Sequence, residues 1–367
     1  MYITPDSYQI SRELFIKDLP NIKNLFPEAI HKSIPIPDSS DLTIDLISCE
    51  GTKAENLIFL TTGLHGIEGF IGSILLQLFI KEFLPLLDPT RTGILLVHCI
   101  NPSGMQRHYR TNRENVDLNR NFVPDFAKMK GNNPDYKFMD KFLNPKFPVR
   151  SELATKTAFI FQTLKWLVLA GSSRVRNAAL MGQYEDQAGM YFGGREIQAE
   201  TKIMMGIIDK WITRFEKTIH LDMHSGYGSR YKMTLVQATS EPLTSAEARQ
   251  LFNIPSVASS NSEEFYKMNG EMCDYIHKVA RDSNRTVYSA AFEFGTYGDG
   301  ILQEARSLLT TIVANQFIGF SASPSNRLWV ESDYQELYFP SESTWLEKSI
   351  QNGRQAFYGI LHAKGLI

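Results

Sequence analysis

The stretch NLIFLTTGLHGIEGFIGSILLQLFIKEFLPLLDPTRTGILLVHCI, residues 56–100, contains the pattern that decides the fold. It begins with an apolar run, 56–62, that is rich in strand-forming residues. Residues 70–84 are long and apolar enough for a buried helix, which Pro85 ends. A second short apolar run follows at 94–100. Strand, helix and strand in this order predict a βαβ unit within a largely parallel sheet.

Similar patterns recur on both sides of this unit. Alternating or continuous apolar runs predict strands at 42–50, 217–223, 233–238 and 286–294, and helical patterns lie at 151–170, 197–213, 301–319 and 343–364. No linker rich in Gly or Ser divides the chain, but the pattern breaks down between about 123 and 195, which indicates an elaborated insertion. We therefore expect one α/β domain over residues 1–367, with a central mixed, largely parallel twisted sheet flanked by helices.

Composition excludes several classes of protein. Hydrophobic residues make up 43% and charged residues 21%, so a folded protein with a sizeable core is expected. Lys and Arg (38) nearly balance Asp and Glu (40), which leaves no overall field to attract nucleic acid or an anionic membrane, and any charge selectivity must be local. The most apolar stretch, Ala158 to Ala170, is shorter than the ~20 residues that span a bilayer, so it is predicted to be a buried helix.

The cysteines and the N-terminus bear on location. Cys49, Cys99 and Cys273 are odd in number and widely spaced, which is typical of a protein in a reducing compartment. The first residues, MYITPDSYQISREL, contain Pro, Asp and Glu where a signal peptide would be apolar. We expect a cytoplasmic protein without nucleic-acid or membrane partners. Nothing in the sequence indicates an oligomeric state.

Metal-ligand side chains follow two of the predicted strands. His65-Gly-Ile-Glu68 lies directly after the strand at 56–62, at the carboxyl end of the sheet, where α/β proteins place their sites. Imidazole nitrogen and carboxylate oxygen are both common zinc ligands, although this pair taken alone is better explained as a surface turn with a Glu near a helix start. His224, in DMHSG (222–226), would supply the third protein ligand that a catalytic zinc site needs. Asp222 either orients a ligand or points to the opposite face of its strand.

Two further motifs contain charged residues. Glu293 stands in the apolar segment FEFG (292–295), where an unpaired carboxylate would be costly. Either a basic partner neutralises it, or it lies at the edge of a cavity with a raised pKa that suits a general base. The stretch RHYRTNRENVDLNRNF (107–122) holds four arginines. Glu114 and Asp117 interrupt this run, which favours a pocket for a carboxylate or an oxyanion over a nucleic-acid patch.

In this chain order, the motifs resemble those of the zinc carboxypeptidase family, of the carboxypeptidase A type. The matching segments are HGIE (65–68), NPSG (101–104), RTNRENVDLNRNF (110–122), DMHSG (222–226) and FEFG (292–295). The resemblance implies one zinc ion per chain, held by His65, Glu68 and His224. It also implies Glu293 as the general base and Arg110 as the group that polarises the scissile carbonyl.

The same resemblance implies the substrate contacts. Asn119 and Arg120 would hold the terminal carboxylate of the substrate, Arg113 would be a second anion contact, and Tyr266 would be a mobile capping residue. The interval between Asn119 and His224 is much longer than in digestive carboxypeptidases. It contains GQYEDQAGMYFGGRE (182–196), which is similar to a segment of a poorly characterised bacterial branch of the family. We expect the insertion to reshape the rim of the pocket.

The function implied is that of a zinc-dependent hydrolase, similar to a metallocarboxypeptidase, which cleaves an amide bond next to a free carboxylate. One alternative is a zinc-dependent deacylase of N-acyl amino acids, because the more distantly similar aspartoacylase and succinylglutamate desuccinylase share the ligand pattern. The substrate is thus expected to be a peptide or an N-acyl amino acid. A second alternative is a non-catalytic binding module that retains the fold.

Overall fold

In the computed structural model, residues 1–367 are described except for 1, 38, 40, 54 and 260–268. The strands are β1 (Ile30–Pro35), β2 (Thr43–Cys49), β3 (Asn56–Thr62), β4 (Thr92–His98), β5 (Lys217–Ser225), β6 (Met233–Gln237), β7 (Val257–Ser259) and β8 (Thr286–Phe294). The α-helices are α1 (Tyr8–Lys17), α2 (Leu19–Lys23), α3 (Gly69–Leu78), α4 (Pro102–Arg107), α5 (Pro134–Phe138), α6 (Asp140–Leu143), α7 (Glu152–Ala170), α8 (Ser172–Leu180), α9 (Ala199–Ile212), α10 (Ser245–Phe252), α11 (Met272–Asp282), α12 (Ile301–Phe320), α13 (Pro324–Tyr338) and α14 (Ser343–Ala363).

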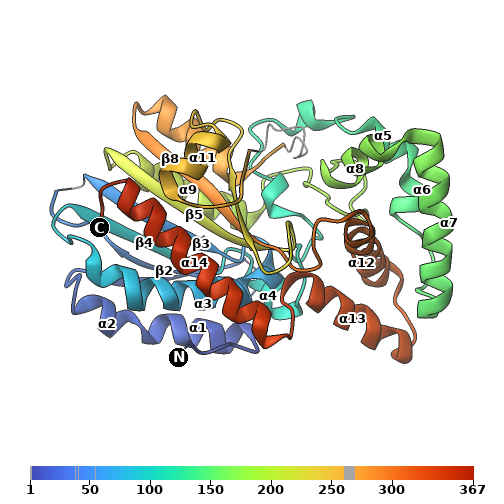
Figure 1. The fold of residues 1–367 in the computed structure, drawn as a ribbon, viewed down its shortest axis with the longest axis horizontal. Coiled ribbons are helices and arrows are strands. Elements are labelled where there is room, and N and C mark those ends of the chain that lie inside the picture. The colour runs from blue at the N-terminus through green and yellow to red at the C-terminus, as the bar shows by residue number, and fades with distance from the viewer. Residues whose placement is uncertain (1, 38, 40, 54, 260–268) are drawn as a thin grey trace.

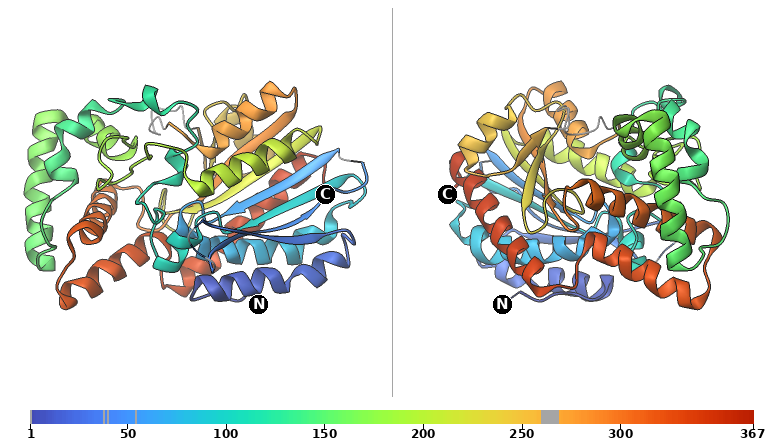
Figure 2. Two further views of the ribbon diagram at one scale, coloured as in Figure 1. Left: turned by 180° about the vertical axis from the view of Figure 1, so that it is seen from behind. Right: turned by 45° about the vertical axis from the view of Figure 1, so that its right-hand side comes forward.

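The strands form one sheet in the order β1-β2-β4-β3-β5-β8-β6-β7 (Figure 1). The central strands β4, β3, β5 and β8 are parallel to one another, and antiparallel pairs lie towards both edges. Helices cover both faces of the sheet (Figure 2). The expected α/β class, with a mixed, largely parallel sheet flanked by helices, is confirmed. So is the βαβ unit, because β3 and β4 pair in parallel on either side of α3.

The two faces of the sheet are packed by different helices. One face is covered by α1, α3, α10 and α14, whose apolar side chains share a cluster with those of the strands. The other face is covered by α9 and α11. Every residue of β4 is buried, as is usual for a central strand covered on both sides. This burial explains why the central strands show continuous apolar runs rather than alternation.

Most predicted strand limits agree closely with the structure. β3 and β8 coincide with the predicted ranges, whereas β4 begins and ends two residues earlier than predicted. β5 runs two residues beyond the predicted end and therefore includes His224. This extension follows from pairing with β8, since the ladder continues through His224 and Ser225.

The predicted helix 70–84 changes its winding along its length. α3 ends at Leu78, and the chain continues as a π-helical turn, Phe79–Phe83, and a 3₁₀ turn, Leu84–Leu86. The whole stretch Gly66–Leu86 is long and apolar enough to cross a membrane, but 72% of its apolar window is buried. Here it is a core helix that covers the sheet.

The insertion forms a helical extension beyond one end of the sheet (right of Figure 1). Helices α5 to α8 enclose a separate hydrophobic cluster that includes Tyr136, Phe142 and Trp166. Ile312 of α12 completes this cluster, so two distant parts of the chain build the extension. The organisation of the chain as a single domain stays a prediction.

The prediction that Ala158–Ala170 forms a buried helix is wrong. A helix is present, but Trp166 is the only buried residue of α7. Apolar side chains surround this helix on all sides, whereas it packs on the rest of the protein along one narrow face. Most of its other apolar side chains are therefore exposed, as in Phe161 at 70% and Val168 at 85%, while Phe159 is partly buried against the cluster of the extension.

Candidate metal centre

The loop after β3 directs two side chains to one point. The loop turns at Gly63, whose φ of +64° favours glycine and where a Cβ would lie 2.3 Å from Cys99 Sγ. His65 precedes a 3₁₀ turn, Gly66–Glu68, which leads into α3. The turn lies against α4 so closely that a Cβ on Gly66 would come within 2.2 Å of the backbone at Gly104. His65 and Glu68 are 3% and 1% exposed.

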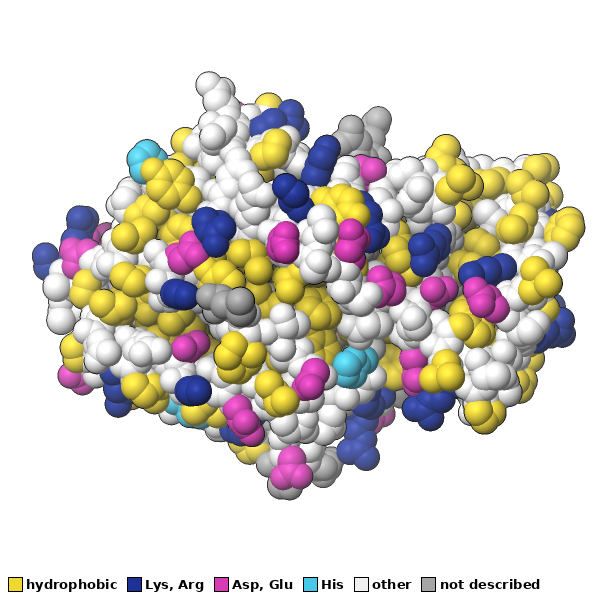
Figure 3. Space-filling model, turned by 60° about the horizontal axis from the view of Figure 1, so that its bottom comes forward, with side chains coloured by type: hydrophobic (Ala, Val, Ile, Leu, Met, Phe, Trp, Pro, Cys, Tyr) yellow, Lys and Arg dark blue, Asp and Glu magenta, His cyan; other side chains and the backbone are white. Residues whose placement is uncertain are grey.

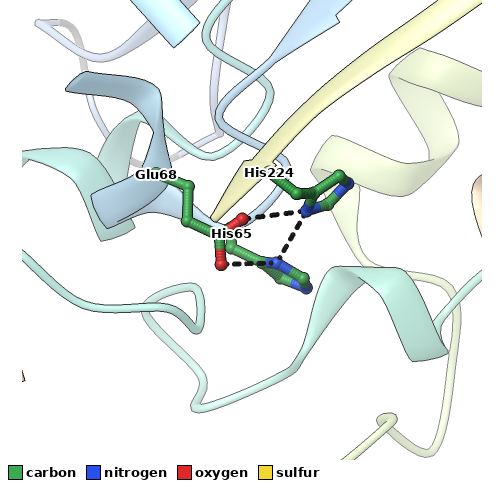
Figure 4. Close-up of side chains that lie close together, drawn as sticks. All are labelled: His65, Glu68 and His224. Atoms are coloured by element: carbon green, nitrogen blue, oxygen red, sulfur yellow. Dashed lines mark hydrogen bonds and ion pairs between the residues drawn. The ribbon is translucent and has the colours of Figure 1, made fainter. Parts of the chain in front are cut away.

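His224 reaches the same point from β5. Its Nδ1 lies 2.9 Å from Glu68 Oε2 and 3.1 Å from His65 Nδ1, while His65 Nδ1 lies 3.0 Å from Glu68 Oε1 (Figure 4). His224 is 2% exposed. The ligand atoms of these three residues all lie within 4.8 Å of one another. The structure thus brings together the three side chains proposed as ligands from the sequence.

Two further carboxylates hold the far sides of the imidazole rings. His65 Nε2 lies 3.2 Å from Asp117 Oδ1, and His224 Nε2 lies 2.6 Å from Asp222 Oδ2. Asp222 therefore faces its histidine, which decides between the two interpretations of that residue. Burial alone would raise the pKa of Asp117, but Arg110 and His65 hold this pKa well below its usual range, so Asp117 is ionised.

The donor set fits a divalent cation. A carboxylate next to each Nε2 favours the tautomer with the proton on that nitrogen, which leaves a lone pair on each Nδ1. Both lone pairs and the Glu68 carboxylate then face one point, where a positive charge is required to offset their repulsion. Two histidines and one glutamate are a donor set typical of catalytic zinc. Burial alone would raise the pKa of Glu68, but the two histidines lower it, so Glu68 remains an anionic ligand.

Glu293 lies beside this centre because of strand register. β8 pairs in parallel with β5 so that Glu293 is the direct neighbour of His224, and paired residues project to the same face of a sheet. Glu293 Oε2 is buried and has no hydrogen-bond partner among the described residues. The pKa of Glu293 is raised to about 8, mainly by burial and also by the negative charge of Glu68, while the positive charges of His224 and Arg110 oppose the shift.

Arg110 is held rigidly next to the centre. Its Nε donates to Asp117 Oδ2 at 3.0 Å, and its Nη1 lies 3.4 Å from Glu68 Oε1. The guanidinium also stacks 5.1 Å from the ring centroid of Tyr191, which belongs to the insertion. The Arg110 backbone N–H donates to the Tyr334 hydroxyl of α13. The insertion and α13 therefore both contribute to the surroundings of Arg110.

The residues proposed as substrate contacts differ in their exposure to solvent. Asn119 is partly exposed, and its Oδ1 accepts from the backbone N–H of Met272. Arg120 is fully buried and donates to the backbone carbonyls of Asn119 and Leu180. Arg113 is exposed to solvent. Tyr266 lies outside the described residues.

Sequence reasoning missed two carboxylates of this region. The sequence suggested Asp117 only as an interruption of the arginine run. Its position in the same motif as Arg110 and Asn119 was the signal that it could support a metal ligand. Glu271 is buried at the start of α11, and its Oε2 has no hydrogen-bond partner among the described residues. Burial and the neighbouring Asp274 raise the pKa of Glu271 to about 8. Its position, just before a helix, resembles an ordinary helix start and gave no signal.

Comparison with known proteins places the chain in a family. The family profile described as "Protein of unknown function (DUF2817)" matches residues 5–352, which is nearly the whole chain. The chain belongs to the DUF2817 family. No curated protein sequence matches the chain.

Several solved structures are similar to this DUF2817 protein. A proposed metallopeptidase from Shewanella amazonensis SB2B shares 12% identity at a TM-score of 0.44, covering 84% of this chain and 91% of the other. Carboxypeptidase A from Helicoverpa armigera shares 16% sequence identity at a TM-score of 0.46, and the match covers 90% of this chain and 73% of the other. An aspartoacylase family protein from Mesorhizobium loti MAFF303099 shares 15% sequence identity at a TM-score of 0.36, and the match covers 80% of this chain and 67% of the other. These are the classes that the sequence motifs resemble. With TM-scores below 0.5, function has to follow from the residues of the site itself.

Proposed function

We propose that this protein is a zinc-dependent hydrolase that cleaves an amide bond next to a free carboxylate of its substrate. The observation that supports this most directly is the convergence of His65, Glu68 and His224, each histidine oriented by its own carboxylate. A ligand set supported in this way is typical of metal sites, where partners of the ligands fix ring orientation. We propose one zinc ion per chain.

Glu293 is the proposed general base. When bound, the zinc ion supplies a water that ionises near neutral pH and a positive charge for a carbonyl oxygen. Glu293, adjacent to His224 in the ladder, is positioned to accept a proton and to return it to the leaving amine. The pKa of Glu293 is about 8 without metal, and the positive charge of a zinc ion would lower it towards the range in which a carboxylate accepts a proton at neutral pH.

Arg110 is the proposed oxyanion contact. Its guanidinium is fixed by Asp117 and Tyr191 before any substrate binds, so it needs little reorganisation when charge develops. We propose that Asn119 contacts the substrate carboxylate and that Arg120, which is bonded to backbone carbonyls, fixes the loop carrying Asn119. The substrate is a peptide or an N-acyl amino acid.

The three cysteines, free and buried, support a reducing, cytoplasmic location.

A metal and substrate assay tests the proposal. Protein purified without chelators should contain zinc and should hydrolyse peptides with a free terminal carboxylate faster than the same peptides with an amidated terminus. Hydrolysis of N-acyl amino acids in place of peptides would favour the deacylase alternative. Zinc-loaded protein that binds carboxylate-ended peptides without cleaving them would favour the binding module. Protein without zinc would overturn the proposal.

The variant Glu293→Gln separates chemistry from metal binding. The amide keeps the size of the side chain but cannot accept the proton, so turnover should fall by about 10²–10⁴-fold. Zinc content should stay at the wild-type value because Glu293 is not among the proposed ligands. Undiminished hydrolysis by a zinc-loaded variant would contradict the role of Glu293.

A further inference from the structure

Helix α7 presents an apolar stripe to solvent. Its five members are Leu153, Ile160, Phe161, Leu164 and Val168, which are 79%, 57%, 70%, 56% and 85% exposed. Their spacing of i, i+7, i+8, i+11 and i+15 places them on one side of an α-helix. The opposite side contributes Trp166 to the cluster inside the extension. Singly scattered exposed apolar residues are ordinary, but a contiguous row of this length indicates a contact surface.

The stripe lies at an extremity of the molecule. α7 is the outermost element at the end of the long axis farthest from the sheet, as Figure 1 and the left view of Figure 2 show. The space-filling view shows hydrophobic side chains gathered at this end, with charged side chains of both signs between them (Figure 3). A helix on a protruding end can rest on a flat surface without interference from the rest of the protein.

The extension differs in charge from the rest of the protein. Residues 123–195 contain eleven Lys and Arg against six Asp and Glu, a net charge of +5. The other residues, with 27 against 34, have a net charge of −7. On α7 itself, Lys156 and Lys165 lie at the two borders of the stripe by helical position, and Lys156 is ion-paired with Glu152 of the same helix. Long lysine side chains at the border of an apolar face can reach anionic head groups while the apolar residues enter the surface.

We infer that the α7 stripe docks on an anionic phospholipid surface. The apolar residues supply burial, and the local positive charge supplies attraction to the negative surface. A second copy of the chain fits less well, because a symmetric dimer through this face would bring two extensions of +5 together. The near-neutral charge of the whole chain predicts no membrane partner, and the separation of charge between the extension and the remainder changes that expectation. This inference does not rest on the proposed hydrolase function.

Vesicle sedimentation with the full chain tests the inference. Wild-type protein should sediment with vesicles of phosphatidylglycerol and phosphatidylcholine, and binding should weaken with added salt and be weaker on phosphatidylcholine alone. The combined variant Ile160→Gln, Phe161→Gln and Leu164→Gln should partition at least about tenfold less, since burial of apolar groups drives interfacial binding. Lys165→Glu should also weaken binding, and it leaves the stripe intact.

The matched control replaces two apolar residues far from α7. Leu86→Gln and Tyr358→Gln, each at a side chain that is 55% exposed, should leave vesicle binding unchanged. Circular dichroism of each variant should match that of the wild type, because all these positions are exposed. Wild-type protein that stays in solution with anionic vesicles would overturn the inference. So would self-association of the wild type that the triple substitution abolishes, since a second copy would then occupy the stripe.

Discussion

At the scale of single residues, two carboxylates determine how the metal-binding histidines present their nitrogens. Asp117 and Asp222 each hold an Nε2, so both Nδ1 atoms face Glu68. Burial alone would raise the pKa of Asp222, but His224 lowers it, which keeps a negative charge behind that ligand. These supporting residues should therefore affect the metal almost as strongly as the ligands do.

Asp222→Asn should lower zinc affinity by about 10–100-fold, because the amide removes the charge that orients His224 and makes it a better ligand. Competition with a chromophoric chelator measures the affinity. Asp209→Asn, at an exposed position whose carboxylate accepts from Tyr275, is the matched control and should bind zinc like the wild type. Equal affinity in Asp222→Asn and the wild type would contradict this account of the site.

Glu271→Gln should change how stability depends on pH. Burial raises the pKa of Glu271 in the folded protein from 4.5 to about 8, so its stabilising contribution is complete below about 4.5 and is lost as pH rises through about 8. The glutamine of the variant does not ionise, so the variant does not lose stability in this way as the pH rises. Between about pH 5 and pH 8, the free energy of unfolding of the variant should therefore gain at least about 1 kcal/mol relative to the wild type. Urea unfolding of both proteins at the two pH values measures the difference, and a constant difference would contradict the prediction.

At the scale of elements, the site depends on two junctions. The turn after β3 positions His65 and Glu68, and the ladder between β5 and β8 places His224 next to Glu293. A shift of one residue in that ladder would turn either side chain to the opposite face. Close packing of the Gly66–Glu68 turn against α4 fixes the first junction.

Gly66→Ala should both destabilise the protein and weaken metal binding. The new methyl would lie 2.2 Å from backbone atoms of Gly104 and Met105, so the turn that carries His65 and Glu68 has to move. Overpacking of this kind costs about 1–3 kcal/mol. Gly206→Ala is the control, since a Cβ there meets nothing within 4 Å and alanine favours the helix α9 by about 0.5–1 kcal/mol. Thermal unfolding and zinc titration of both variants test this, and wild-type zinc affinity in Gly66→Ala would count against it.

At the scale of the whole molecule, a sheet covered on both faces forms one core, and the extension has a separate cluster. The metal centre lies at the carboxyl ends of β3, β5 and β8 and contributes few of the apolar contacts. The fold should therefore persist without the ion, and the ion should add stability by binding only to the folded state.

Removal of the metal should lower the melting temperature without unfolding the protein. At a free zinc concentration about 100 times the dissociation constant, binding adds about 2.7 kcal/mol, which corresponds to several degrees. Thermal scans with a chelator and then with excess zinc measure the shift. The variant His224→Ala should show little of this shift. Loss of secondary structure on chelation would contradict the prediction.

Local sequence was sufficient for the central elements and for the ligand triad. β3 and β8 lie at their predicted ranges because buried parallel strands give continuous apolar runs. His65 and Glu68 stand directly after such a run, and His224 stands at the end of another. Helix α7 was misjudged because apolar content by itself does not tell which side of a helix packs on the protein.

By itself, the sequence determined the types of the main elements, their order and the polar residues that end the strands, because these depend on neighbours along the chain. Only the tertiary structure decided that His65 and His224, 159 residues apart, meet at one carboxylate. It also decided that Asp117 and Asp222 stand behind them, that Glu271 is buried, and that the α7 stripe faces solvent. These facts depend on strand register and on which faces pack together, and such contacts join residues that no local pattern connects.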